Sequence, residues 1–210
     1  SHAVGQALGE ELRADDLAGI FVLSDGLAVN GSTLVDGLRS ALGDKVVISG
    51  GLAGDGARFQ DTLVMVDAQA TNGLVAAVGF YGSAVRFAHG TAGGWDEFGP
   101  IRKITKSVGS VLYELDGKPA LDLYETYLGE EAAELPAAGL LYPLKIWNSD
   151  AAGDQVVRTI LSIDREARSM TFAGDMPEGT NARLMRGSFE NLVDGAAQAA
   201  IHARNVMGQD

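Results

Sequence analysis

The sequence predicts an α/β or α+β fold with mixed β-sheets: an N-terminal strand–helix–strand unit, antiparallel strands and flanking helices. Two observations carry this prediction. Near the N-terminus, a segment with the apolar spacing of a helix lies between two short apolar runs. Further along, apolar runs follow one another across turns of a few residues, which are too short to connect parallel strands. The 210 residues suit one large domain or two small ones.

The strand–helix–strand unit is predicted from its apolar runs and its caps. Ile20–Leu23 and Val46–Ser49 have the composition of buried strands. Between them, Asn30 begins a run of cap residues, apolar side chains recur at helical spacing, and Gly43 supplies a stop. Two strands joined by a helix are most simply parallel neighbours. The loop at Asp25–Gly26 should therefore lie close to the loop after the second strand, where α/β proteins often bind ligands.

The remaining elements are predicted from the same patterns. Apolar runs bounded by glycine, asparagine or aspartate are typical of strands, and a proline before a run with helical spacing indicates the start of a helix. The expected strands are Leu63–Val66, Val75–Tyr81, Val85–His89, Ile101–Thr105, Val111–Leu115, Leu140–Trp147, Val156–Ile163 and Met170–Ala173; the expected helices are Leu8–Leu17, one from Pro119 to Gly129, and a last one after Ser188 with Leu192, Val193, Ala196, Ala200 and Ala203 facing inward.

A glycine-rich loop follows the second predicted strand. Gly50, Gly51, Gly54 and Gly56 fall within seven residues, and glycine lets a backbone adopt positive φ and approach a ligand closely. The spacing from Gly51 to Gly56 is that of a P-loop, but Ala57–Arg58 stands where Lys and Ser/Thr are required. The dinucleotide fingerprint also fails, because its third glycine is missing and a strand follows instead of a long helix. Neither nucleotide motif is therefore predicted.

Composition excludes several classes of function. The net charge of −12 argues against nucleic acid as a partner and against adhesion to an anionic membrane, because both need clustered Lys and Arg. The chain has no cysteine, so disulfides and thiolate chemistry are excluded. No apolar run approaches the roughly 18–20 residues of a membrane helix. No signal peptide is recognisable either, so a cytoplasmic location is expected.

No catalytic residue or metal ligand is predicted. The sequence contains no Gly-x-Ser-x-Gly elbow and no His-Glu-x-x-His motif. The acids Asp96–Glu97, Asp150 and Asp154 are expected to be solvated loop residues.

His89 and two aromatic residues stand out beside the glycine-rich loops. On a strand over Val85–His89, His89 would point toward the core, at the start of a second glycine-rich loop over Ala88–Pro100. A buried histidine, a ligand contact and an iron ligand all fit that position. Phe59 and Trp95 each lie in or just after a glycine-rich loop. An aromatic wall next to accessible N–H groups is typical of a small-ligand pocket, although each aromatic residue alone suits an ordinary core.

Two blocks of sequence are specific enough to compare with a known protein family. The first is GGLAGDG at Gly50–Gly56, followed by Phe59 and by Thr62 at the start of an apolar run; the second is ITKSVGSVLYELDGKPALDLY at Ile104–Tyr124. In content and order they resemble the FIST domain, a bacterial sensory module. The resemblance implies a partial N-terminal FIST subdomain at residues 1–115 and a partial C-terminal FIST subdomain at residues 116–210.

This resemblance implies a small-molecule-sensing domain of bacterial signal transduction rather than an enzyme. The implied ligand is an amino acid or related metabolite, and the implied output partner is a histidine kinase, a cyclic-dinucleotide enzyme or a chemotaxis receptor. Two alternatives stay open: a haem-based nitric oxide sensor, with His89 as the iron ligand, and an enzyme of unrecognised type. No other cofactor is expected. Acidic side chains suit an ammonium group, whereas Lys106 and loop N–H groups suit a carboxylate. The predicted ligand-binding residues are Asp25, Asn30, Gly51, Gly54, Asp55, Phe59, His89, Trp95 and Lys106.

Overall fold

The computed structural model describes residues 1–148 and 155–208. They form two compact units: the first comprises Ser1–Gly56, Gln60–Gly94 and Glu190–Asp210, and the second comprises Ala57–Phe59 and Trp95–Phe189. Asp150 and Asp154, predicted to be loop acids, lie outside the described residues. Helices are combined with mixed and antiparallel sheets, so the fold is α+β, within the predicted class.

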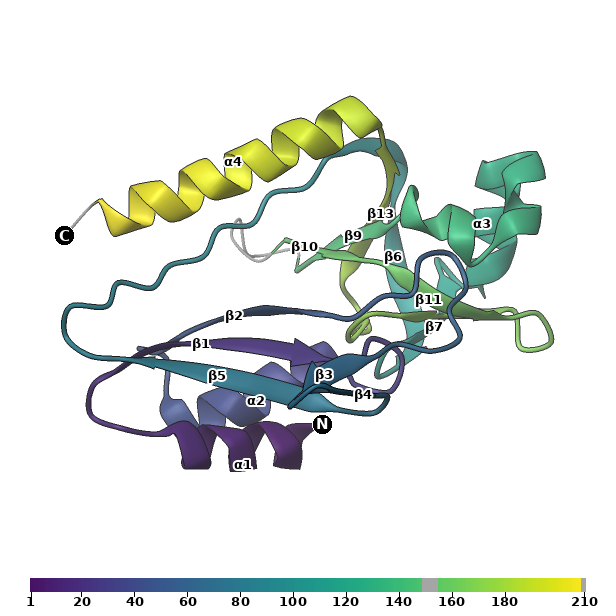
Figure 1. The fold of residues 1–210 in the computed structure, drawn as a ribbon. Helices are drawn as coiled ribbons and strands as arrows, with labels where there is room; N and C mark the ends of the chain where they lie inside the picture. The colour runs from purple at the N-terminus through teal and green to yellow at the C-terminus, as the bar shows by residue number, and fades with distance from the viewer. Residues whose placement is uncertain (149–154, 209–210) are drawn as a thin grey trace. The chain divides into compact units, whose positions relative to one another are not determined.

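The first unit contains the predicted strand–helix–strand arrangement (Figure 1). Its sheet has the order β2-β1-β5, with β1 and β2 parallel and β1 and β5 antiparallel. Asn30 caps α2 by accepting a hydrogen bond from the Thr33 N–H at 3.0 Å, and Gly43 ends it with φ 74°. The elements are α1 (His2–Leu12), β1 (Leu17–Ser24), α2 (Gly31–Leu42), β2 (Val47–Leu52), β3 (Val64–Val66), β4 (Gln69–Thr71), β5 (Val75–Tyr81) and α4 (Phe189–Met207).

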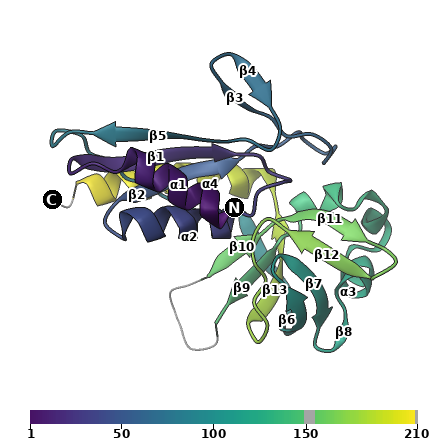
Figure 2. The same ribbon diagram turned by 90° about the horizontal axis from the view of Figure 1, so that it is seen from below.

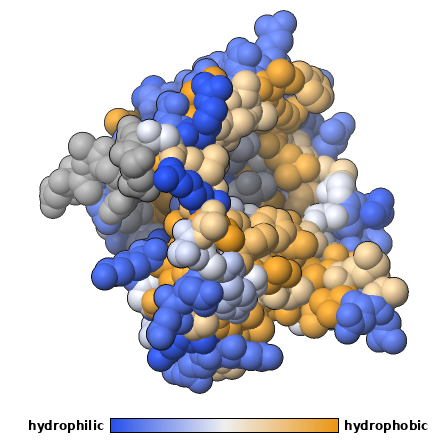
Figure 3. Space-filling model, turned by 60° about the vertical axis from the view of Figure 1, so that its left-hand side comes forward, coloured by the Kyte–Doolittle hydropathy of each residue, from blue (hydrophilic) through white to orange (hydrophobic). Residues whose placement is uncertain are grey.

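One face of this sheet is covered by α1 and α2 (Figure 2). Ile20 and Val22 of β1 are buried against Leu34 and Leu38 of α2, as the alternation of side chains along a strand requires. On the opposite face, the neighbouring apolar residues keep between 38% and 56% of their surface exposed; they are Phe21, Leu23, Val78 and Phe80. Apolar side chains also reach the surface elsewhere, as the face of the molecule in Figure 3 shows.

The predicted strand at Val85–His89 is wrong. After β5 the chain runs as an irregular extended segment to Gly94, alongside α4 (Figure 1). The glycines explain this course: a Cβ on Gly90 would lie 2.1 Å from the Ala199 carbonyl oxygen, and one on Gly94 would lie 2.3 Å from the Leu192 nitrogen. The segment therefore packs directly on the helix backbone rather than joining the sheet.

The predicted inward face of the last helix is only partly correct. Leu192 and Ala203 are half-buried, but Val193, Ala196 and Ala200 are exposed. The helix residue buried most fully is Gly195, where a Cβ would approach Gly93 to 3.0 Å. Close backbone approach, rather than apolar periodicity, sets which side of α4 is covered.

The second unit is an antiparallel sheet with one helix packed on it. The strand order is β10-β9-β13-β6-β7-β12-β11, with β8 paired to β7. The long strand β6 pairs with β13 through Trp95–Lys103 and with β7 through Ile104–Val108. The elements are β6 (Trp95–Val108), β7 (Val111–Leu115), β8 (Lys118–Pro119), α3 (Ala120–Leu128), β9 (Leu144–Trp147), β10 (Val156–Arg158), β11 (Ile160–Asp164), β12 (Ser169–Phe172), β13 (Asn181–Gly187) and the 3-10 helices η1 (Gly129–Glu134) and η2 (Ala137–Leu140).

The core of the second unit confirms the predicted stripe of α3. Leu121, Tyr124 and Leu128 are buried in the cluster that also contains Phe172 and Leu144. The predicted loop at Ala88–Pro100 is wrong at its C-terminal end, because β6 already begins at Trp95. Asp96–Glu97 is consequently part of a strand, where the Glu97 carboxylate pairs with Lys145 at 2.8 Å and with Arg183. Among the described helices, none has both the length and the apolar character needed to span a bilayer.

Candidate functional site

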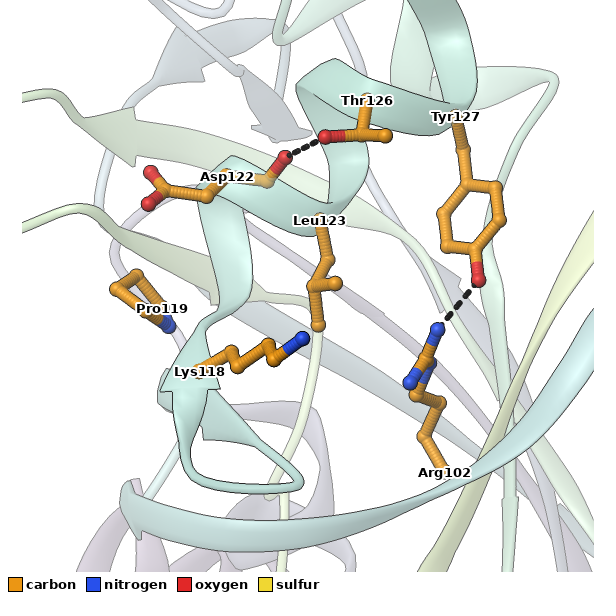
Figure 4. A pocket seen from close by; sticks show the side chains of 7 residues that line it. All are labelled: Arg102, Lys118, Pro119, Asp122, Leu123, Thr126 and Tyr127. Carbon is orange, nitrogen blue, oxygen red and sulfur yellow. Dashed lines mark hydrogen bonds between the residues drawn. The ribbon is translucent and has the colours of Figure 1, made fainter.

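The second unit carries a hollow of about 550 Å³ beside α3 (Figure 4). We call it the α3 hollow. Its lining comes from β6, from β8 and from one side of α3; the residues are Arg102, Lys118, Pro119, Asp122, Leu123, Thr126 and Tyr127.

A tight turn between β7 and β8 positions the N-terminus of α3. Asp116 and Gly117 both have positive φ, at 52° and 72°, as a two-residue hairpin turn of this hand requires. The turn returns the chain so that Lys118 pairs with Leu115 and Pro119 with Glu114. Pro119 then leads directly into α3.

The geometry of α3 brings its lining residues together. Asp122 and Thr126, and likewise Leu123 and Tyr127, are four positions apart and so lie on neighbouring parts of one helix side. The Thr126 hydroxyl donates a hydrogen bond to the Asp122 carbonyl oxygen at 2.8 Å. Leu123 and Tyr127 project toward Arg102 (Figure 4).

Arg102 is the most constrained side chain of the hollow. Its guanidinium donates to the Tyr127 hydroxyl at 2.6 Å and to Asp116 Oδ2 at 3.0 Å, and it lies 5.9 Å from the centre of the Tyr127 ring. The hydrogen bonds to Tyr127 and then to Asp116 raise the pKa of Arg102, so it stays cationic. Asp116 accepts a bond from the Lys103 N–H at 2.8 Å, which contributes most to lowering its pKa. Arg102 Nε is buried and, within the described part of the chain, has no hydrogen-bond partner.

The α3 hollow is lined by two cations and one acid, Arg102, Lys118 and Asp122. Lys118 is exposed, and its ammonium group points into the same space as Arg102 (Figure 4). The Asp122 carboxylate points away from these two cations in the figure and forms an ion pair with Arg168. Two cations thus converge on one opening, where Arg102 is also paired with Asp116. A carboxylate is the simplest group that satisfies both.

A second, smaller cavity of about 20 Å³ adjoins the α3 hollow. Arg102, Leu123 and Tyr127 line both spaces. The rest of the small cavity is apolar; its other lining residues include Phe98, Leu115, Tyr124, Leu144, Ala182 and Leu184. Phe98 meets the Tyr127 ring edge-on, with 6.3 Å between the ring centres. The Tyr127 ring, whose hydroxyl accepts from Arg102, is therefore held in place by Phe98.

Asp25, the first of the residues predicted to bind a ligand, has a role in the loop itself. It is only 2% exposed. Its Oδ1 accepts hydrogen bonds from the N–H groups of Leu27 and Ala28, at 2.7 and 2.8 Å, and its Oδ2 accepts from Gly73 at 2.7 Å. Burial raises the pKa of Asp25, but these bonds and one from Thr62 outweigh burial and lower it to about 2. The carboxylate ties together two loops of the first unit.

The predicted meeting of loops at the ends of β1 and β2 is confirmed. Gly51 pairs with Leu23, and the Ala53 N–H donates to the Ser24 carbonyl at 2.8 Å. Asp25 and Gly51 therefore lie at the same end of the sheet. Gly51 and Gly54 have open space where a side chain would be.

Asn30 and Asp55 both stabilise local backbone. Asn30 is the cap of α2. Asp55 Oδ2 accepts from the N–H groups of Gln60 and Asp61, at 2.8 and 3.1 Å, and so closes the glycine-rich loop. A ligand role for either residue stays a prediction.

The other predicted ligand residues are divided between the two units. His89 is exposed in the extended segment of the first unit, so its predicted orientation toward the core is wrong; the strand that would have turned it inward does not form. Phe59, Trp95 and Lys106 belong to the second unit. Trp95 begins β6 and packs against Gly187, and Lys106 is exposed, with its ammonium 5.6 Å from the centre of the Tyr113 ring.

The residues that line the α3 hollow are not among those predicted to bind a ligand. The signal was present in the segment DGKPALDLY at Asp116–Tyr124, which supplies Lys118, Pro119, Asp122 and Leu123. Arg102 had no local signal, because its partners stand 14 and 25 residues further along the chain.

Two protein-family models together match almost the whole chain, including both sequence blocks that resemble the FIST domain. The FIST N domain matches residues 1–118, and the FIST C domain matches residues 120–209. No curated protein and no solved structure matches the chain. Among the described residues, no group of three or more His, Cys, Asp or Glu side chains could hold a metal ion.

Proposed function

The chain belongs to the FIST domain family, and on this premise we propose that it senses a small carboxylate-bearing metabolite, such as an amino acid, through the α3 hollow. Domains of this family are sensory domains of signal transduction. The proposal assigns ligand binding, not catalysis, to the hollow. A histidine kinase, a cyclic-dinucleotide enzyme or a chemotaxis receptor would receive the signal. A boundary between N-terminal and C-terminal FIST subdomains near residues 115 and 116 is part of the same proposal.

The observation that carries the proposal is the convergence of Arg102 and Lys118 on one opening. Arg102 is held by two hydrogen bonds, so little side-chain freedom is lost when a ligand binds. Lys118 is exposed and can adjust to the second carboxylate oxygen. Pro119, Leu123 and Tyr127 add apolar surface, which is how small-ligand pockets are usually built.

Thermal unfolding in the presence of free amino acids and short carboxylic acids tests the proposal. Both tryptophans, Trp95 and Trp147, belong to the second unit, so tryptophan fluorescence reports the unfolding of that unit. A ligand at about 100 times its dissociation constant should add about 2.7 kcal/mol to the free energy of unfolding. A panel at millimolar concentrations that leaves the fluorescence melting temperature unchanged would count against the proposal.

Two lysine variants locate the binding. Lys118→Gln should weaken binding of the stabilising compound about tenfold or more, because a charge-assisted hydrogen bond is lost. Lys106→Gln is the matched control: it removes an exposed lysine of the same unit that lies outside the α3 hollow. If Lys106→Gln weakens binding and Lys118→Gln does not, the ligand binds near Lys106 and not in the hollow.

A further inference from the structure

The α3 hollow and the small cavity share one wall. Arg102, Leu123 and Tyr127 stand between a polar opening with two cations and an apolar space beneath it. On one side the small cavity is lined by buried core side chains, among them Leu115 and Leu144, which are held in place by close packing. One ligand could therefore place a charged group in the α3 hollow and an apolar group in the small cavity.

The volume of the small cavity limits what can enter. About 20 Å³ is room for roughly one or two water-sized groups. The lining is almost entirely apolar, so a methyl or ethyl group gains more there than water does. Leu123 is half-buried and forms part of the shared wall, which makes it the side chain whose size decides how far a tail can reach.

We propose that the ligand is a carboxylate with a short aliphatic tail, that its carboxylate binds Arg102 and Lys118, and that its tail enters the small cavity past Leu123 and Tyr127. This inference rests on the proposed function and narrows it. The two cations fix the charged end, and the small cavity selects the length of the tail. Among amino acids, it favours those with small aliphatic side chains.

The test is a series of straight-chain carboxylates, from acetate to hexanoate, titrated against the full chain by calorimetry. Affinity should rise about fourfold for each methylene that enters the cavity, because burial of one methylene stabilises by about that factor. It should then fall for the longer members, whose tails exceed the space. Leu123→Ala should move the optimum to a longer tail.

Two further variants test whether the small cavity sets the optimal tail length. Thr126→Ala is the control: Thr126 lines the α3 hollow but not the small cavity, so the optimum should not move. Leu144→Phe, which enlarges a side chain that lines the small cavity but not the α3 hollow, should abolish the gain with tail length and leave acetate binding as it was. Carboxylates that bind with the same affinity at every tail length, or an optimum unmoved by Leu123→Ala, would overturn the inference and leave the proposed function standing. A series in which no carboxylate and no amino acid binds would overturn the proposed function itself.

Discussion

Gly50→Ala is expected to destabilise the first unit by about 3 kcal/mol or more, since a Cβ forced against backbone cannot be relieved by a rotamer change. Gly50 lies in β2, paired with Val22 of β1. A Cβ at Gly50 would lie 1.8 Å from the Val22 carbonyl oxygen and 2.9 Å from the Val22 nitrogen. To relieve this contact, the edge strand β2 would have to move away from the central strand β1.

Gly51→Ala is the matched control for this prediction. Gly51 is the next residue of the same strand, is exposed, and has no atom within 4 Å of the Cβ position. The substitution should change stability by no more than about 0.5 kcal/mol. The measurement is the protection of β1 and β5 amides from hydrogen exchange, together with urea unfolding followed by circular dichroism. Equal stabilities for the two variants would mean that β1 and β2 are not paired in the register described.

Asp25→Ala should have the second large effect, a loss of about 3 kcal/mol, because it leaves several N–H donors without an acceptor. The donors are the N–H groups of Leu27, Ala28 and Gly73. They belong to the loop after β1 and the loop before β5, at the same end of the sheet. The Thr62 hydroxyl also loses a partner. The loops around the ends of β1 and β5 should lose their order, and urea unfolding at pH 7 measures the difference.

The pH dependence gives this prediction a second signature. The pKa of Asp25 is lowered from 3.8 to about 2 in the folded chain, so the carboxylate contributes stability above its unfolded pKa. That contribution is lost as the pH falls from about 4 toward 2. The unfolding free energies of the native chain and of Asp25→Ala should therefore converge in acid. A difference that stays constant from pH 7 to pH 2.5 would show that the charge of Asp25 is not what holds the loops.

Much of the fold was predictable because its signals are local. Asn30 and Gly43 mark the ends of α2, Pro119 and Gly129 mark α3, and β5 has the predicted bounds. The strand β13 was not predicted: its sequence NARLMRG lacks β-branched residues, and it forms because Ala182 and Leu184 are buried between β6 and β9. The apolar residues of Val85–His89 predicted a strand, but the segment from there to Gly94 runs along α4 through backbone contacts at Gly90 and Gly94, which no side-chain periodicity indicates.

The candidate site was less predictable, for a physical reason. Glycine loops and isolated acids attract attention in a sequence, but Asp25 and Asp55 are engaged by backbone N–H groups of their own loops. The α3 hollow depends on Arg102 meeting Tyr127 and Asp116, and this contact exists only once β6, β7 and α3 have packed together. Family resemblance identified the segment that contains Lys118, but only packing shows which of its side chains face a common space.

The most direct test of ligand sensing at the α3 hollow is a titration of the ¹⁵N-labelled chain with the best carboxylate of the series, followed by ¹H–¹⁵N spectra. We expect the amide shifts to concentrate at Lys118, Leu123 and Tyr127, which line the α3 hollow. Lys118→Gln should reduce the shifts at a given concentration. Shifts that instead fall in the glycine-rich loop over Gly50–Asp61, with Lys118, Leu123 and Tyr127 unmoved, would contradict the account and return the ligand to the first unit.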